Sequence, residues 1–193
     1  MARNYLRTVF TDAARALQAA DGSRPGYARL EASADGTPDA LTARELDFIA
    51  GRDSFYLATV TSDGWPYVQH RGGPPGFLRA LPGNRLGFAD YRGNRQHVST
   101  ANISSEPRVS LFLMDYPNQR RLKLLGHARV VTGAADPALL RALAPPGYAA
   151  VPERAYLIDV IGYDWNCPQH IVPRYSAADL GQAGWLPPAG DSR

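Results

Sequence analysis

The sequence has only one cysteine, Cys167, and only one lysine, Lys123, among its 193 residues. A single cysteine excludes an internal disulfide, which is consistent with a reducing compartment. No run of about 18 apolar residues is present, and the first residues lack the apolar core of a signal peptide, so we expect a cytoplasmic protein with no membrane segment. All other basic residues are arginines. Arginine suits fixed contacts with phosphate or carboxylate groups, but a GC-rich genome would also enrich it.

Several catalytic motifs are absent as well. The chain has no Gly-x-Gly-x-x-Gly, Walker A, Gly-x-Ser-x-Gly or His-Glu-x-x-His sequence, which argues against a Rossmann enzyme, a P-loop NTPase, an α/β-hydrolase and a zincin. The net charge of +3 is spread along the chain, which argues against nucleic-acid binding. Cys167 and His170 have a spacing seen in metal sites, but no second pair completes four ligands, so we expect no metal.

The sequence does contain many short segments of alternating polarity, separated by turns. Asp63-Gly64 between the segments 55–60 and 65–71 is a hairpin signal. The overall pattern indicates a mainly β protein, a six-stranded antiparallel barrel with peripheral helices. Longer strands are predicted over 108–115, 121–131 and 156–163.

The two ends of the chain differ from this central part. Helical spacing of apolar residues predicts one helix over 5–20, and residues 21–40 look like an irregular connector. A capping box formed by Thr42 and Glu45 predicts a helix over 42–51. Two further short helices are predicted over 94–103 and 138–144. We expect three parts: a helix and connector over 1–40, the barrel with a functional tail over 41–175, and an extension over 176–193.

A polar segment, Asp90–His97, leaves a predicted strand, turns at Gly93 and enters a predicted helix. The free amides and positive dipole of a helix N-terminus attract anions. Arg92 and Arg95 would add charge-assisted hydrogen bonds of roughly 1.5–3 kcal/mol each. The alternative is a solvated turn whose arginines contact nothing, and the sequence leaves both interpretations open.

Two other segments are candidates for ligand contacts. The predicted strand 65–71 runs into a Gly-Gly-Pro-Pro sequence from Gly72, which either lets the backbone approach a flat ligand or simply makes a rigid loop. In the strand 121–131 the charged residues share one face. That face is either solvated or contributes Arg121 and Lys123, near the strand end, to a ligand.

Four short motifs follow one another along the chain: Asp63-Gly64-Trp65-Pro66, Phe88-x-Asp90-Tyr91-Arg92-Gly93-Asn94-Arg95, Asn102-(x)4-Pro107-Arg108-Val109 and Arg121-Leu122-Lys123-x-x-Gly126-x-Ala128. Their order resembles the pyridoxamine 5′-phosphate oxidase-like family of FMN-binding split barrels. The resemblance is strongest to the branch described as related, FMN-binding. It covers residues 42–131, and the tail at 164–170 is also similar to that branch.

The resemblance implies a six-stranded split barrel that forms a homodimer, with one FMN in each of two clefts between the subunits. It implies that Arg95 holds the flavin phosphate, helped by Asn94 and Gln96. Many members have a lysine where Gln96 stands, so Lys123 and backbone amides would contribute more here. Arg121 matches a polar position that contacts the flavin. The other implied cofactor contacts are Gln69, His70 and Arg71 along the isoalloxazine ring, followed by Gly72, Asp90 and Tyr91.

The family suggests an FMN-dependent oxidoreductase that moves hydride through flavin N5 to or from a small substrate. Pyridoxamine phosphate is not the expected substrate, because the Arg-Pro-Arg-x-Ser and Arg-x-His segments that would hold its phosphate are missing. The tail would cover the flavin and shape the substrate pocket, with His170 as the proton donor or acceptor. Alternatively, the tail is a structural clasp that seals the dimer. The tail residues in question are Trp165, Asn166, His170 and Arg174.

Two alternative functions remain open. One is a flavin-binding carrier or sensor without turnover. The other is a split barrel that binds a deazaflavin or haem, for which Cys167 and His170 would be the candidate haem residues.

Overall fold

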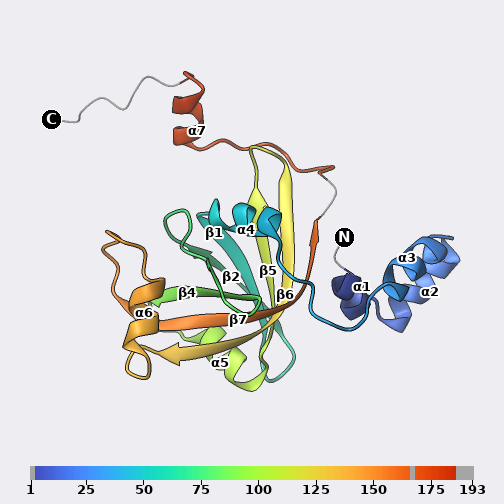
Figure 1. The fold of residues 1–193 in the computed structure, drawn as a ribbon, viewed down its shortest axis with the longest axis horizontal. Coiled ribbons are helices and arrows are strands. Elements are labelled where there is room, and N and C mark those ends of the chain that lie inside the picture. The colour runs from blue at the N-terminus through green and yellow to red at the C-terminus, as the bar shows by residue number, and fades with distance from the viewer. Residues whose placement is uncertain (1–2, 166–167, 186–193) are drawn as a thin grey trace.

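The computed structural model describes residues 3–165 and 168–185. Within these ranges seven strands form one antiparallel sheet in the order β2-β1-β5-β6-β7-β4-β3 (Figure 1). Short turns join three of the neighbouring pairs, β1 with β2, β3 with β4 and β5 with β6, so local sequence signals fix these hairpins. The strands are β1 (Ser54–Val60), β2 (Pro66–Gly72), β3 (Arg79–Leu81), β4 (Arg85–Tyr91), β5 (Arg108–Asp115), β6 (Arg120–Thr132) and β7 (Pro152–Trp165).

The sheet curls around an apolar core but does not close, because β2 and β3 are its two edges. This confirms the expected mainly β, split-barrel fold. The strand count is seven rather than six, because the three-residue β3 pairs with β4 across the turn at 82–84. Alternate residues of each strand point inward. The fully buried core side chains include Phe55, Leu57, Leu111, Leu113, Leu122, Leu124 and Tyr156.

Three helices lie beside the sheet. The capping box at Thr42 and Glu45 starts α4 (Ala43–Ala50), as predicted, and Asp136 caps α6 (Pro137–Leu143). The helix α5 (Val98–Ser105) begins four residues later than predicted. Its start is delayed because Arg95 and His97 have φ values of 59° and 56°, a left-handed conformation that cannot continue a right-handed helix.

The N-terminal region differs from the sequence prediction in two ways. The expected helix over 5–20 is two helices, α1 (Arg3–Val9) and α2 (Asp12–Ala20), because the Thr11 hydroxyl accepts a hydrogen bond from the amide of Ala14 and caps a new helix. The expected connector contains a third helix, α3 (Arg24–Ala32), with a proline in its first turn.

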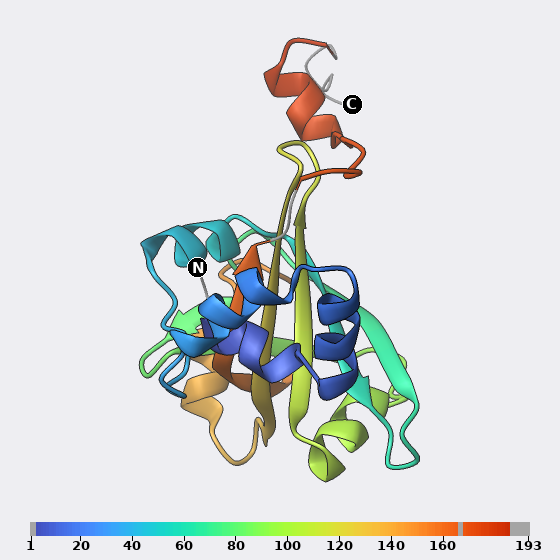
Figure 2. The same cartoon turned by 90° about the vertical axis from the view of Figure 1, so that its right-hand side faces the viewer.

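These N-terminal helices are attached to the barrel through hydrogen bonds to β7. The Asp39 carboxylate accepts hydrogen bonds from the amides of Asn4 and Tyr5, both at 3.0 Å. The side chain of Asn4 donates to the carbonyl of Ile161 at 2.7 Å. Gly162 allows this contact, because a Cβ there would lie 2.8 Å from the Tyr5 backbone. Figures 1 and 2 show the helices beside the end of β7.

The C-terminal residues 168–185 form an arm that includes α7 (Ala177–Gln182). It rises beyond the hairpin between β5 and β6 (Figure 2). Ile171 is buried there, and Gln119 donates a hydrogen bond to its carbonyl at 2.7 Å. Arg174 lies 4.8 Å from the ring centre of Tyr116. Among the described residues, none of the helices combines the length and apolarity that a membrane crossing requires.

Candidate functional site: a basic pocket in the barrel split

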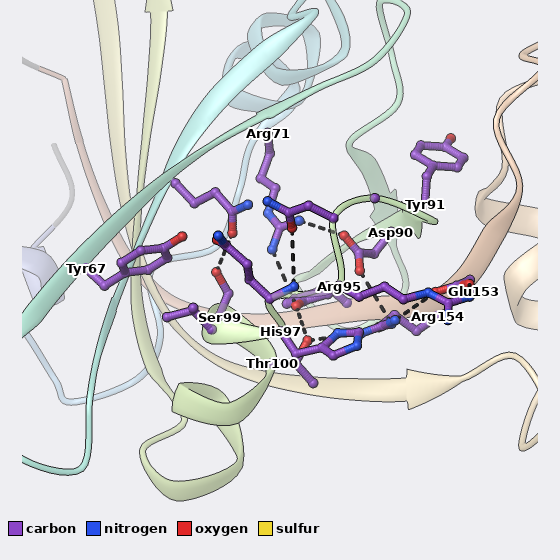
Figure 3. A pocket seen from close by; sticks show the side chains of 16 residues that line it. Tyr67, Arg71, Asp90, Tyr91, Arg95, His97, Ser99, Thr100, Glu153 and Arg154 are labelled. Carbon is purple, nitrogen blue, oxygen red and sulfur yellow. Dashed lines mark hydrogen bonds and ion pairs between the residues drawn. The ribbon is translucent and has the colours of Figure 1, made fainter.

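A pocket of about 80 Å³ lies where the barrel is open, between the edge strand β2 and the start of α5. The end of β4, the loop 92–97 and the start of β7 complete its wall (Figure 3). Segments far apart in the sequence therefore meet there. Of the residues expected to contact a cofactor, the pocket brings together Gln69, Arg71, Asp90, Tyr91, Asn94, Arg95 and Gln96.

The alternation of β2 decides which of its residues reach the pocket. Tyr67, Gln69 and Arg71 line it. Val68 and His70 point to the opposite side and are exposed. An inward-facing residue of a central strand would be apolar, but β2 has no strand beyond it, so its inward side chains face the opening and are polar.

Arg71 connects the two sides of the split. Its guanidinium donates to the Asp90 carboxylate at 2.6 Å and to the Tyr156 hydroxyl at 3.4 Å. It also lies 5.0 Å from the ring centre of Tyr156. The buried Nε has no hydrogen-bond partner among residues 3–165 and 168–185. A buried donor without a partner is costly, so this atom is available to a ligand.

Asp90 lies between two arginines. Arg154 Nε is 3.4 Å from its second oxygen, and the Arg71 and Asp90 side chains are only 14% and 13% exposed. Burial raises the pKa of the Asp90 carboxyl, although Arg71 and Arg154 oppose this shift. The pocket is therefore a poorly solvated environment, in which each further charge needs a partner.

The loop before α5 presents hydrogen-bond donors to the pocket. The side chain of the cap residue His97 makes no capping hydrogen bond, so it does not satisfy the first amides of the helix, which carry its positive end. Ser99 donates to Gln69 at 2.8 Å, and Thr100 and Tyr156 share a hydrogen bond of 2.6 Å. His97 Nδ1 is 2.8 Å from Arg154 Nη1. This arrangement is suited to an anion.

Four expected cofactor residues lie elsewhere on the chain. His70 and Gly72 face the outer side of the sheet, as do Arg121 and Lys123 two strands beyond β1. Lys123 forms an ion pair with Asp164 at 3.2 Å, and the buried Nε of Arg121 has no hydrogen-bond partner in the part of the chain that the structure describes. Within one chain, Lys123 does not reach the pocket beside Arg95, because strand alternation puts it on the other side of the sheet.

The tail residues are also remote from this pocket in a single chain. Trp165 donates from its indole nitrogen to the Glu45 carboxylate at 2.7 Å and packs against Phe48. This contact joins the end of β7 to α4 within one chain. His170 and Arg174 belong to the C-terminal arm and do not line the pocket. Asn166 and Cys167 lie outside the described residues.

The loop that follows β2 is closely packed. In the Gly-Gly-Pro-Pro segment at the end of β2, Gly73 packs closely on Phe77, because a Cβ there would lie 2.8 Å from the Phe77 ring. Several residues that line the pocket were not predicted from the sequence, and most of them come from α5 and β7. A signal was available only for β7, where Arg154 and Tyr156 alternate with Ala155 in a strand. The missed residues are Tyr67, Ser99, Thr100, Glu153, Arg154 and Tyr156.

An open barrel with a basic, hydroxyl-lined pocket in its split defines the class of split-barrel proteins. A sequence model described as pyridoxamine 5′-phosphate oxidase matches residues 41–157, more than half of the chain. The chain therefore belongs to the pyridoxamine 5′-phosphate oxidase family.

Solved structures share the fold. HupZ of Group A Streptococcus is 17% identical, with a TM-score of 0.54 over 70% of this chain and 99% of that chain. A Lactobacillus delbrueckii protein described by the name pyridoxamine 5′-phosphate oxidase is 22% identical, with a TM-score of 0.51 over 65% of this chain and 93% of that chain. At these identities the likeness concerns the fold alone. A search of curated proteins found no match.

Proposed function

We propose that the pocket binds the phosphate end of FMN, and that the chain is an FMN-dependent oxidoreductase that acts on a small molecule. The observation that carries the proposal is the convergence of three guanidiniums, those of Arg71, Arg95 and Arg154, on the uncapped start of α5. Family membership supports the same ligand class. Arginine forks and helix N-termini are the usual partners of phosphate groups.

The residues present fit a phosphate ester with a polyol chain. Arg95 is 62% exposed, and its guanidinium lies 3.8 Å from the Glu153 carboxylate, a long ion pair that a ligand phosphate would replace. The Arg71 Nε lacks a partner, and the hydroxyls of Ser99 and Thr100 can share their hydrogen bonds with ligand oxygens. Gln96 stands where a lysine would add charge, so the phosphate would depend on the arginines and on backbone amides.

The size of the pocket supports a site shared by two copies of the chain. Ligand pockets typically measure about 300–1,000 Å³, whereas this one offers about 80 Å³. It can hold one end of the cofactor but not its flat tricyclic ring. The rest of the ligand would extend out of the split toward a second subunit.

A suitable face for that second subunit is the outer side of β2, β1, β5 and β6. Tyr56 and Val68 are 41% and 60% exposed there. Cross-strand pairing puts His70, Tyr56, Phe112 and Lys123 in one row across the four strands. We propose that two copies pack through this face. In a two-fold interface each copy presents the same residues, so His70, Gly72, Arg121 and Lys123 would approach the partner's flavin.

When bound, FMN supplies hydride transfer at its N5 atom, so the protein needs few catalytic side chains. In this proposal Arg95, Arg154 and the start of α5 hold the phosphate, and Arg71, fixed by Asp90, orients the ligand along β2. The apolar side chains of the outer face, Tyr56, Val68 and Phe112, would exclude water from the ring. The C-terminal arm, with His170 and Arg174, would cover the partner's site.

The test is a comparison of FMN and riboflavin binding by fluorescence quenching. Arg95→Ala should weaken FMN binding about 10- to 100-fold, as expected for one charged hydrogen bond, and leave riboflavin binding unchanged. Arg141→Ala, an exposed arginine of α6 outside the pocket, is the matched control. Equal FMN affinity in all three proteins would refute the phosphate assignment.

Turnover needs a separate measurement. Loss of the flavin absorbance under anaerobic conditions with NAD(P)H or with a panel of small reduced substrates would support an oxidoreductase. A bound flavin that stays oxidised with every reductant would identify a carrier or sensor instead.

A further inference from the structure

Glu153 is an acidic residue inside the basic pocket, and the proposed phosphate site does not explain it. Its carboxylate lines the pocket. One oxygen accepts a hydrogen bond from Arg92 Nε at 2.9 Å and lies 3.8 Å from Arg95 Nη2. The other oxygen accepts from Arg154 Nη2 at 2.9 Å. A single carboxylate thus contacts three of the guanidiniums at this site.

The backbone places Glu153 there through an irregularity in the sheet. Asp90 pairs with Arg154, but the next residue, Tyr91, pairs with Pro152, so Glu153 is skipped in the pairing of β4 and β7. Such a bulge changes the direction of a side chain and is frequent beside functional sites. Successive residues of a regular strand point to opposite faces. Here the adjacent residues Glu153 and Arg154 both line the pocket.

The charges of the pocket show what this carboxylate does. Three arginines, Arg71, Arg95 and Arg154, and two acids, Asp90 and Glu153, line it. Asp90 is committed to Arg71 at 2.6 Å, deep in the split. Glu153 is instead held by the more exposed Arg92 and by Arg154. It therefore occupies the arginines that an incoming anion would use.

We propose that Glu153 is a tethered anion that competes with the ligand phosphate and so sets the affinity and selectivity of the site for phosphate esters. A phosphate dianion must displace this carboxylate from Arg95 and Arg154, the arginines proposed to hold the phosphate, and it binds against the remaining negative charge. The neutral parts of the ligand are unaffected. The inference rests on the proposed function for the identity of the ligand, but the competition itself concerns any phosphate group.

The ionisation state of Glu153 supports its proposed repulsion of a phosphate. Arg92 beside the carboxylate holds the pKa of Glu153 below its ordinary value, despite partial burial. The group is therefore ionised at neutral pH. An ionised carboxylate a few ångströms from a dianion repels it strongly where the surroundings are poorly solvated.

The key variant is Glu153→Gln, which removes the charge but keeps the shape and an oxygen that accepts from the arginines. We expect it to tighten FMN binding about tenfold, since one charge at contact distance is removed, and to leave riboflavin binding unchanged. Glu106→Gln is the matched control, because Glu106 forms an Arg–Glu pair with Arg108 outside the pocket. Glu153→Ala serves as a second variant, and thermal unfolding checks that each protein is folded.

Inorganic phosphate separates this inference from the proposed function. The amide NMR signals of Arg95 and Ser99 in titrations with phosphate alone report on the site without any flavin. Tighter phosphate binding by Glu153→Gln supports the inference even if the wild-type chain binds neither FMN nor riboflavin, a result that would overturn only the proposed function. Unchanged or weaker binding of phosphate by Glu153→Gln would overturn the inference, and weaker binding would show that Glu153 positions the arginines instead.

Discussion

Replacing Trp165 by phenylalanine would test whether the contact between the end of β7 and α4 stabilises the fold. The indole nitrogen donates to Glu45 at 2.7 Å, and Glu45 is only 2% exposed. This carboxylate also accepts hydrogen bonds from the amide and the hydroxyl of Thr42, at 3.1 and 2.5 Å. A hydrogen bond to a charged group contributes about 1.5–3 kcal/mol. Because phenylalanine keeps a ring against Phe48, we expect a loss near 2 kcal/mol in the free energy of unfolding.

The pH dependence of this loss follows from the same contacts. Burial opposes ionisation of Glu45, but the hydrogen bonds from Thr42 and Trp165 outweigh it and hold the pKa below the ordinary value. The stabilisation is therefore complete above about pH 4.5 and is lost as the pH falls through the lowered pKa. The effect of Trp165→Phe should shrink over the same range.

Urea unfolding of a double-mutant cycle with Glu45→Gln measures the interaction. In the Glu45→Gln background the same replacement should cost only about 1 kcal/mol, as expected for a bond to a neutral acceptor. FMN binding per folded chain should change little. A variant with unaltered stability but lost FMN binding would contradict this stabilising role and favour a role of Trp165 as a flavin cover.

Two further predictions concern the barrel framework. Asn84→Ala should cost about 2–3 kcal/mol of unfolding free energy, because three hydrogen bonds of 2.9–3.0 Å are lost and alanine must adopt a φ of 57°. Asn84→Gly removes the same hydrogen bonds without the backbone strain and so isolates their part. Stability of Asn84→Ala equal to wild type would contradict the stabilising role of these hydrogen bonds. Gly126→Ala should lower the melting temperature through a loss of about 1–3 kcal/mol, since its Cβ would lie 2.6 Å from the Asp159 carbonyl oxygen. An unchanged melting temperature would show that the backbone of β6 and β7 moves apart there at no cost.

The strands were predictable because their signals are local. Asp63-Gly64 between β1 and β2, and the capping box at Thr42, act within a few residues. The N-terminal helices were harder, since Thr11 competes with an otherwise continuous helical pattern and only the actual fold shows that its cap forms. The helix α3 was missed because Pro25 and Gly26 lie in its first turn, where a proline is tolerated but looks like a loop.

The pocket residues were predictable only where they are neighbours in the sequence. The polar run from Asp90 to Gln96 precedes a helix, and this local signal led to the prediction of an anion site. Glu153 and Arg154 reach the same pocket from β7 through a bulge, which no short sequence pattern specifies. Grouping His70 with Gln69 and Arg71 overlooked the two-residue period of a strand, which puts His70 on the outer face.

The most direct test of the account is sedimentation velocity of the chain with FMN, followed at 280 nm and at the flavin absorbance near 450 nm. The account predicts that both signals move together as a species of about 42 kDa, twice the 21.0 kDa of one chain, with one flavin per chain. Flavin that sediments apart from the protein, or a folded chain that remains at 21.0 kDa in saturating FMN, would contradict it.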